Sequence, residues 1–422
     1  MWGAIPGLAG GQHLFGSIDD PSELPRPAWW MRTTFVEPAA GLSLVGAQWR
    51  SAARLRAHFE SRSASGEFDG SLRAGIYGRY EPDADEAYDL VRSIRHLRIN
   101  TPGAYARIGT PTRTRFGEGL LVDFYNGTAV WDERTAGLEL ALSGSRFSLS
   151  AMASDVRMDR IVGGRVEFRP LGAAGRGLRL GAELVTDRRF ERDAANTPTA
   201  RSVDIRLTAA RSGGFRLEPF AAAGELLRYG RGISVGADLE NDNFIDLARF
   251  HARLSLSYAE ARFIPGYFGS FYEVHNPQAE IAAGEGIGEV AGVPLRSAAA
   301  GTYLGSELRI LFFERFEFWY AFRRHFGDQA LSTFHVRLFI RSERLLFSFA
   351  EDRGGLRNFF SLFNDVGDES IMSFRAEYRL RGPIWLRVDA RYGYIPLLEI
   401  DGRTRYAVQR RFEPFMGLRL EF

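Results

Sequence analysis

The stretch PFMGLRLEF, residues 414–422, closes the sequence and decides its fold. From residue 416 onward every second position is apolar, and the positions between carry Gly, Arg and Glu. The apolar residues are Met416, Leu418, Leu420 and Phe422. Because the side chains of a strand point alternately to its two faces, this stretch predicts a strand with one apolar face. In a soluble domain such a strand would leave an aggregation-prone edge, so the fold depends on whether the rest of the chain repeats the pattern.

Segments of about nine to twelve residues repeat this period of two along the chain. In STFHVRLFIR (332–341), MSFRAEYRL (372–380) and IWLRVDARY (384–392), apolar residues alternate with charged or polar ones. Only Arg-Gly-Pro separates the last two segments, which is the spacing of a β-hairpin. The same alternation occurs in 177–184, 250–259 and 316–322.

Two all-β architectures produce such alternation. A soluble sandwich or propeller uses strands of about five or six residues. A transmembrane barrel uses strands of about nine to eleven residues, apolar outward and polar inward, joined by short and long connections in turn. Strand length, uncharged apolar faces and alternating connection lengths favour the barrel. The sequence therefore predicts an all-β fold, a transmembrane antiparallel β-barrel of about 16 to 20 strands, with about 18 as the central value.

Such a barrel places the protein in a bacterial outer membrane, in contact with outer-membrane lipids. Residues 41–422 are predicted to form the single barrel. Residues 1–40, which contain several Gly, Pro and Trp residues, are predicted to form a periplasmic tail or a plug in the lumen. The start, MWGAIPGLAGGQHLFG, lacks the features of a signal peptide, so an exported chain is expected to have lost one or to begin further upstream.

The composition excludes several classes of protein. The 54 basic residues, all arginine, and 52 acidic residues give a net charge of +2, too balanced to indicate a nucleic-acid partner. The absence of Cys excludes disulfides and thiol catalysis, and the seven His residues show no metal-ligand spacing. No apolar run reaches the roughly 18 residues of a membrane helix. We expect no metal, no cofactor and no enzymatic activity.

The terminal stretch also resembles the C-terminal sorting signal of bacterial outer-membrane proteins, in which a final aromatic residue follows alternating apolar ones. The residues of this signal are Met416, Leu418, Leu420 and Phe422. The resemblance implies that the outer-membrane assembly machinery recognises the strand by pairing with it. In a closed barrel the last strand pairs with the first, which removes the exposed edge.

A second resemblance rests on segments in the middle of the chain. Residues 85–128 contain DEAYDLVRSIRHLRIN, YARIGTPTRTRFGEGLLVDFYN and a following Gly-Thr pair. VGGRVEFRPLG (162–172), LRLGAELVTDR (178–188) and RFIPGYFGSFYEV (262–274) come later. In this order they resemble an uncharacterised, porin-like family of bacterial outer-membrane β-barrel proteins that carry RxIRYxRY, GxGLxxxxYN and GGRxxxRPL segments. His96 and Ile99 stand where the first pattern has Tyr. The resemblance implies an outer-membrane barrel without known catalytic residues.

The long connection FGEGLLVDFYNGTAVWDE (116–133) is too apolar for a freely solvated loop, and its glycines allow tight turns. Two placements stay open: the loop folds into the lumen and narrows it, or it packs over the barrel rim. The candidate constriction residues are Glu118, Leu120, Leu121, Asp123, Phe124 and Tyr125. The aromatic segment 262–274 is assigned to the interfacial belt, in preference to a loop that grips a ligand.

Charged residues on the polar faces of neighbouring strands are the candidates for lining the lumen. They are Glu307, Arg309, Arg337, Arg375, Glu377, Arg379, Arg387, Asp389 and Arg391. In a wide barrel these side chains would face water and select solutes by charge, whereas in a narrow or plugged barrel they would pair and fill the lumen. The six arginines and three carboxylates favour anions in an open pore.

Three functions fit this barrel. The leading hypothesis is a porin-like channel for small hydrophilic solutes, because roughly 16 to 18 strands leave an aqueous channel unless loops fill it. The alternatives are a plugged transporter of hydrophobic substrates, with residues 1–40 as the plug, and a structural barrel that anchors a surface complex through residues 279–300. The expected partners are outer-membrane lipids, the assembly machinery during biogenesis, and further copies of the chain or a surface complex.

Overall fold

The computed structural model describes residues 34–422 apart from 62, 77, 81–82, 84–86, 172–176, 191–196, 245–246, 275–288, 291–292, 295–297, 314, 328, 330, 357–369 and 399–403. The first strand begins at Phe35, before the predicted boundary at residue 41. The tail or plug predicted for residues 1–40 lies outside the described residues up to residue 33. Most of the predicted anchoring segment, 279–300, also lies outside them.

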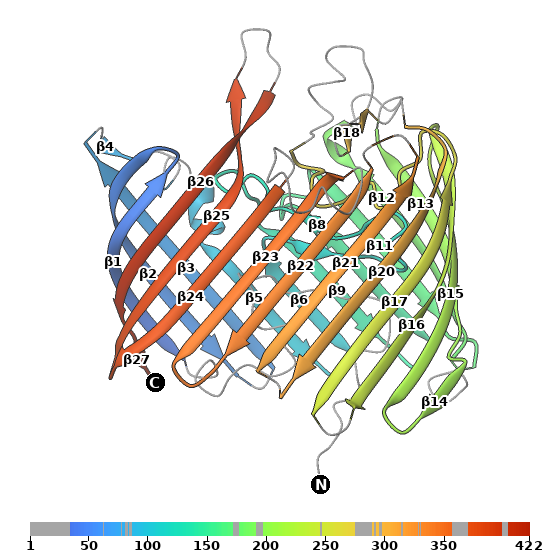
Figure 1. Cartoon of the computed structure of the whole chain (residues 1–422), viewed down its shortest axis with the longest axis horizontal. Coiled ribbons are helices and arrows are strands. Elements are labelled where there is room, and N and C mark those ends of the chain that lie inside the picture. Colours follow the sequence, from blue (N-terminus) through green and yellow to red (C-terminus); the bar gives the residue numbers. More distant parts are fainter. Residues whose placement is uncertain are drawn as a thin grey trace.

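The described residues form a closed antiparallel barrel of 20 strands, in which each strand pairs with the next and the last pairs with the first (Figure 1). The strands are β1 (Phe35–Val45), β2 (Gln48–Glu60), β3 (Ala64–Gly75), β5 (Ile94–Thr101), β6 (Ala104–Gly109), β9 (Gly137–Ser143), β10 (Phe147–Ala153), β11 (Ile161–Phe168), β12 (Arg179–Asp187), β13 (Thr199–Arg206), β15 (Phe215–Leu226), β16 (Gly230–Phe244), β17 (Ala248–Ala259), β20 (Gly301–Phe312), β21 (Phe316–Phe326), β22 (Ser332–Arg341), β23 (Leu345–Leu356), β24 (Ser370–Arg381), β25 (Ile384–Leu398) and β26 (Thr404–Leu418).

Shorter elements lie in the connections or extend these strands. They are β4 (Gly78–Arg79), β7 (Thr112–Thr114), β8 (Tyr125–Asn126), β14 (Ala210–Ser212), β18 (Glu289–Val290), β19 (Val293–Pro294), β27 (Leu420–Glu421), the helix α1 (Tyr88–Arg92) and a 3-10 turn at Arg188–Phe190. None of the helices in the described ranges is long and apolar enough to cross a membrane.

The strand number corrects the central prediction of 18, although 20 lies within the predicted range. Several strands of the N-terminal half are short: β5 has eight residues, β6 has six, and β9 and β10 have seven each. Side chains alternate between the two faces of a strand about every two residues, so a strand this short has only three or four positions on each face. Alternation over so few residues is a weak signal. The count from the sequence is therefore too low.

The two rims of the barrel differ in the length of their connections. Connections of two or three residues join β2 to β3, β5 to β6, β9 to β10, β20 to β21, β22 to β23 and β24 to β25, on the rim where β1 begins and the chain ends (Figure 1). The opposite rim carries the longer connections, among them 110–136 and 260–300. In bacterial outer-membrane barrels the short turns face the periplasm, so the longer connections start from the extracellular rim.

The terminal strand closes the barrel against the first strand. Gly41 of β1 pairs with Phe415 of β26, and Val36 pairs with Leu420 of β27. The backbone N–H of Phe422 donates to the carbonyl oxygen of Thr34 at 2.8 Å. Met416, Leu418, Leu420 and Phe422 are all exposed on the outer face. The edge that this apolar strand would present alone is therefore paired, and recognition of the strand by the assembly machinery stays a prediction.

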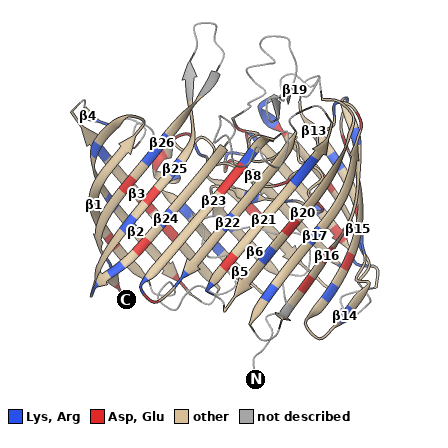
Figure 2. Cartoon of the chain, in the orientation of Figure 1, with Lys and Arg blue, Asp and Glu red and all other residues tan. Residues whose placement is uncertain are grey.

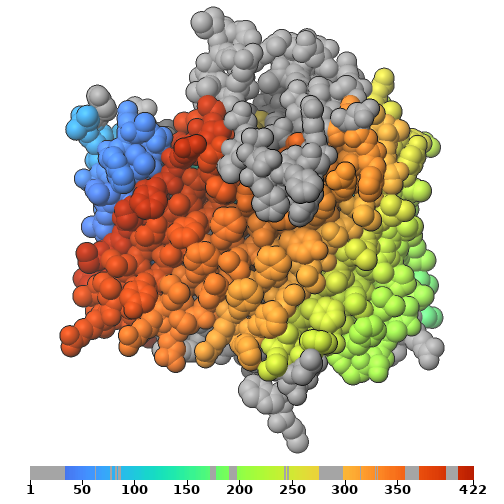
Figure 3. All heavy atoms as spheres, viewed as in Figure 1, coloured from blue at the N-terminus to red at the C-terminus, as the bar shows by residue number. Residues whose placement is uncertain are grey.

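The outer face of the wall is apolar. Leu254, Leu256 and Tyr258 of β17 are exposed on it, and similar residues follow the other strands. Space-filling atoms of β15 to β26 form one continuous outer surface (Figure 3). Inward positions carry most of the buried charged residues. An apolar outer face with a polar inner face is the pattern of a barrel surrounded by lipid.

Replacing Leu254 by Arg is expected to lower the free energy of unfolding by about 2–4 kcal/mol, because Leu254 lies outward near the middle of β17. Urea unfolding in lipid vesicles, followed by heat-dependent gel mobility, measures this loss. Leu171→Arg, at an exposed position of the periplasmic rim, is the control and is expected to cost about 0–1 kcal/mol. Equal losses for the two variants would contradict the assignment of the outer face to lipid.

Candidate functional site in the lumen

The connection between β6 and β9, residues 110–136, enters the lumen, and we call it the inner loop. Its residues from 110 to 127 are almost all buried, and β7 pairs with β8 inside the barrel. The tip turns at Gly117 and Gly119, whose φ angles are +49° and +71°. The positive φ angle at Gly117 favours glycine there, and a Cβ at this position would also displace the guanidinium of Arg165. Of the two placements left open, the structure adopts the one inside the lumen.

The aromatic segment 262–274 packs against the inner loop. Gly266 N–H donates to the carbonyl of Leu120 at 2.9 Å, and Phe268 N–H donates to that of Leu121 at 3.1 Å. The two segments share an apolar core inside the barrel, to which they contribute Phe116, Leu120, Leu121, Val122, Tyr125, Phe263, Ile264, Tyr267, Phe268 and Tyr272. The assignment of this segment to the interfacial belt is wrong, because its rings face the inner loop and not the lipid headgroups.

Glu118 at the tip of the inner loop is held by two arginines of the wall. Its carboxylate accepts from Arg206 Nη2 at 2.6 Å and from Arg253 Nη2 at 2.8 Å, and these contacts are called the tip ion pairs. Arg206 also contacts Asp238 at 2.6 Å. Burial acts to raise the pKa of Glu118, but the guanidinium groups of Arg206 and Arg253 outweigh it and lower the pKa to about 2. Glu118 is therefore an anion at neutral pH.

Asp123 attaches the return arm of the inner loop to the wall. Arg115, on the other arm, donates from Nε to Asp123 Oδ1 at 2.6 Å and from Nη1 to Glu307 Oε2 at 2.8 Å. Arg323 of β21 forms a further ion pair with Asp123. These contacts join the two arms of the loop to each other and to β20 and β21. Charged groups therefore fix the two arms next to the tip.

Phe124 and Tyr125 complete the candidate constriction set, and both are buried. The ring of Phe124 meets Trp319 of β21 edge-on, with 5.2 Å between centroids. The hydroxyl of Tyr125 donates to Glu273 Oε1 at 2.7 Å. Burial, together with the Glu273 carboxylate, raises the pKa of Tyr125, so this hydroxyl stays a neutral donor. The two residues thus tie the inner loop to the wall and to the aromatic segment.

Charged side chains also fill the lumen where β24–β26 meet β1–β3, a region that we call the closure seam. Near the periplasmic rim, Arg56 lies 3.3 Å from Glu37, 3.3 Å from Glu67 and 3.0 Å from Glu377. Arg419 contacts Glu37 at 2.6 Å and Glu377 at 2.9 Å. All five side chains are buried, so they neutralise one another away from water.

A second layer of ion pairs lies above the first. Asp389 contacts Arg54 at 2.6 Å, Arg375 at 2.9 Å and Arg387 at 2.7 Å. Arg54 also pairs with Asp69 of β3. Figure 2 shows acidic and basic residues side by side on neighbouring strands of this region. Of the predicted lumen residues, Arg375, Glu377, Arg387 and Asp389 thus meet in one network.

Five predicted lumen residues remain, and one of them, Arg391, lies against the ring of Trp131 of the inner loop, with its Cζ 3.4 Å from the ring centroid. Glu307 contacts the inner loop, as described above, and Arg309 forms an ion pair with Glu317 at 3.3 Å. Arg337 is buried on β22. Arg379 lies at the periplasmic rim, where its Nε donates to the carbonyl of a turn glycine at 2.9 Å. The predicted set therefore divides between the seam, the opposite wall and the rim.

The predicted set contains more arginines than carboxylates, but the lumen as a whole does not share this excess. Glu37, Glu67, Asp69 and Glu413 supply further carboxylates from β1, β3 and β26, and each contacts an arginine of the seam. Two of them were missed because a partner lies more than 300 residues away, as between Glu37 and Arg419 and between Glu413 and Arg73. In the sequence, all four residues are marked only by their position on the polar face of a strand, and closure of the barrel is needed to bring the first and last strands together.

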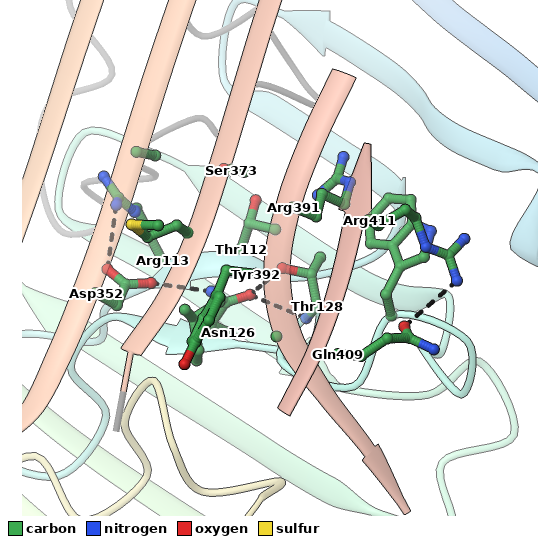
Figure 4. A pocket seen from close by; sticks show the side chains of 15 residues that line it. Thr112, Arg113, Asn126, Thr128, Asp352, Ser373, Arg391, Tyr392, Gln409 and Arg411 are labelled. Carbon is green, nitrogen blue, oxygen red and sulfur yellow. Dashed lines mark hydrogen bonds and ion pairs between the residues drawn. The ribbon is translucent and has the colours of Figure 1, made fainter. Parts of the chain in front are cut away.

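Cavities lie on more than one side of the inner loop. The first cavity, of about 530 Å³ of empty space, is lined by Thr112, Arg113, Asn126 and Thr128 of the loop (Figure 4). Across it, Asp352 of β23 accepts from Arg113 Nη2 at 3.1 Å and from Asn126 Nδ2 at 3.0 Å.

Two other cavities lie against the inner loop. The second cavity, of about 550 Å³, shares Trp131, Arg391 and Arg411 with the first and is lined mainly by arginines and carboxylates. The third, of about 380 Å³, is lined by four loop residues: Arg115, Glu118, Asp123 and Phe124. The inner loop therefore separates the third cavity from the first.

The closed barrel, its apolar outer face and its charged interior define a bacterial outer-membrane β-barrel protein, and the fold implied by the sequence resemblance is confirmed. Several solved structures similar to the chain are outer-membrane barrels. Wzi from Escherichia coli, described as a carbohydrate binding β-barrel involved in group 1 capsule assembly, has a TM-score of 0.37 at 10% identity and covers 93% of this chain and 85% of its own.

Two further solved structures give similar values. OpdL from Pseudomonas aeruginosa has a TM-score of 0.36 at 12% identity, with 92% of this chain and 98% of its own covered. OccAB2 from Acinetobacter baumannii has a TM-score of 0.35 at 11% identity, with the same coverage of 92% and 98%. No protein-family model matches the chain, and no curated protein matches it. These similarities concern the fold alone.

Proposed function

We propose that the protein is a selective outer-membrane channel for small polar solutes that is closed at rest, with the inner loop as its gate. The observation that carries this proposal is that one loop lines cavities on two sides. It lines the first through Thr112, Arg113, Asn126 and Thr128, and the third through Arg115, Glu118, Asp123 and Phe124. Movement of the loop would join these cavities. A permanently open diffusion porin fits less well, because loops and ion pairs occupy the lumen.

The tip is the part of the inner loop best suited to move. Gly117 and Gly119 tolerate several backbone conformations, and charged contacts through Glu118 hold the tip to the wall. Water can replace such contacts when the tip swings away, whereas the apolar core formed with the aromatic segment resists hydration. We infer that the tip opens while the body of the loop stays packed.

Conductance in planar bilayers tests the proposal. The purified protein, folded by the criterion of heat-dependent gel mobility, is expected to give rare, brief openings and no large steady current. Swelling of liposomes in small sugars is expected to be slow for the same reason. A large, steady conductance at neutral pH would overturn the closed resting state and favour a general diffusion porin.

A second candidate is a barrel that anchors or binds a surface component without conducting. The apolar core between the inner loop and the aromatic segment favours it, because this core holds both segments in place. A folded protein that stays silent, even after the tip ion pairs are removed, would support this candidate over the channel. Transport of hydrophobic substrates receives less support, because polar side chains dominate the lining of the second cavity and line the first at the inner loop.

A further inference from the structure

Three guanidinium groups lie close to the ring of Trp131, which is near the end of the inner loop. The Cζ atoms of Arg391, Arg134 and Arg95 lie 3.4, 4.1 and 4.5 Å from its ring centroid. The indole is buried and lies between the first and second cavities, both of which it lines. Cation–π contacts of this kind hold positive groups at a fixed place without neutralising them.

Most charges around the second cavity are already balanced. Its six carboxylates each contact an arginine: Asp69 with Arg54, Asp83 with Arg73, Asp89 with Arg92, Asp132 with Arg411, Asp389 with Arg387, and Glu413 with Arg73. The guanidinium that calls for an explanation here takes part in none of these six contacts.

Arg134 is this guanidinium. Its Nη1 donates to the carbonyl of Trp131 at 2.8 Å and its Nη2 to the carbonyl of Arg92 at 3.0 Å, while its Nε is buried without a hydrogen-bond acceptor among the described residues. The neighbouring carboxylate of Asp132 is occupied by Arg411 at 2.6 Å and by the hydroxyl of Tyr80 at 2.8 Å. Arg134 is thus oriented by neutral carbonyls and keeps its charge unbalanced.

A second arginine of this cavity also has an unused donor. Arg411 is almost fully buried, and its Nη2 donates to Asp132. Its Nε, however, has no acceptor among the residues that the structure describes. Burial, followed by the positive charge of Arg95, with Arg391 and Arg411 also contributing, lowers the pKa of Arg134. The direction of this shift agrees with a local excess of positive charge, which a bound anion would relieve.

We propose that the second cavity binds a small polar solute through a carboxylate or phosphate group, with Arg134 as its main cationic partner and Trp131 as its apolar wall. Arginine presents a planar fork that suits both anions, and a low local dielectric strengthens the contact. The inference rests on the proposed function in one respect, since it names the class of solute that the channel would take.

Equilibrium binding to the purified full-length protein in lipid-free detergent tests the site. Isothermal titration with glucuronate, inorganic phosphate and glucose is expected to show binding of at least one anion and none of glucose. Arg134→Gln is expected to weaken the anion's affinity about tenfold or more, because it removes a charged hydrogen-bond donor. Arg157→Gln, at an exposed arginine of another extracellular connection that also contacts a carboxylate, is the matched control and should bind as the wild type does.

Arg134→Lys keeps the charge and loses the fork, and it is expected to bind with an affinity between those of the wild type and the Gln variant. It also keeps the test decisive if the Gln variant fails to fold by gel mobility. Binding of neither anion, equal binding by the wild type and both Arg134 variants, or a signal that requires added lipopolysaccharide would overturn the proposal. Anion binding by a protein that does not conduct would support the binding site and contradict the proposed channel. Gated conductance without anion binding would support the channel and overturn the binding site.

Discussion

Replacing Arg56 by Gln is expected to lower the free energy of unfolding of the barrel by about 3–5 kcal/mol. The guanidinium of Arg56 lies 3.0–3.3 Å from Glu37, Glu67 and Glu377, and all four side chains are buried in the closure seam. Its removal leaves three carboxylates with one fewer cation in a region that water does not reach easily. Urea unfolding in lipid vesicles, read from heat-dependent gel mobility, measures the loss.

Arg201→Gln is the matched control for this prediction. Arg201 pairs with Glu225, but its side chain is 65% exposed, and exposed pairs contribute about 0–1 kcal/mol. A double variant, Arg56→Gln with Glu67→Gln, should recover part of the loss, because it removes one unbalanced carboxylate together with the cation. An unfolding free energy of Arg56→Gln equal to that of Arg201→Gln would mean that the seam is hydrated and that its ion pairs contribute little.

Glu118→Gln is expected to raise the open probability of the channel about 100-fold, because it removes the charge of the tip ion pairs. The lowered pKa of Glu118, about 2 against an ordinary value of 4.5, corresponds to about 3 kcal/mol in favour of the closed tip. Arg206 keeps Asp238 at 2.6 Å, so the wall should stay intact when the carboxylate is lost. Single-channel recording at neutral pH measures the change.

The same contact predicts how the wild-type channel responds to acid. A carboxyl whose pKa is lowered in the closed state stabilises that state above its ordinary pKa, 4.5, and loses this effect as the pH falls towards about 2. Openings of the wild type are therefore expected to become frequent below about pH 4.5, while those of Glu118→Gln should not follow this titration.

Glu225→Gln, at the partner of Arg201, serves as the control for both experiments on the tip. Its carboxylate contacts two exposed arginines outside the inner loop, so its loss should leave the conductance unchanged. A folded Glu118→Gln variant that remains as silent as the wild type would reject the tip as the gate. It would then favour the anchoring or binding barrel.

The fold follows from the sequence because alternation is a local property. The segments 332–341, 372–380 and 384–392 each show both faces within a few residues, and the structure has strands at all three places. The strand count was less accurate because β5 and β6 offer too few positions to display the period. Local patterning thus predicts the class of fold better than the exact size of the barrel.

The candidate site was only partly predictable, because its contacts join distant parts of the chain. The glycines and apolar residues of 116–133 indicate an unusual loop, but its placement depends on Arg206 and Arg253, which the sequence does not connect with Glu118. The segment 262–274 shows the other difficulty. Aromatic residues suit a membrane interface as well as a buried core, so composition alone does not distinguish the belt from the lumen.

The closure seam has a consequence for how the barrel is assembled. Arg56 and Glu37 come from the first two strands of the chain, whereas Glu377 and Arg419 come from its last portion, so the network is complete only when both ends have docked. In a partly inserted sheet these charged side chains stay in contact with water, which solvates each of them without an ion pair. A sheet that closed without β1 would bury Glu377 and Arg419 without Glu37. Electrostatics therefore penalise premature closure and favour one order of events, in which the membrane-embedded wall seals last and in the correct register.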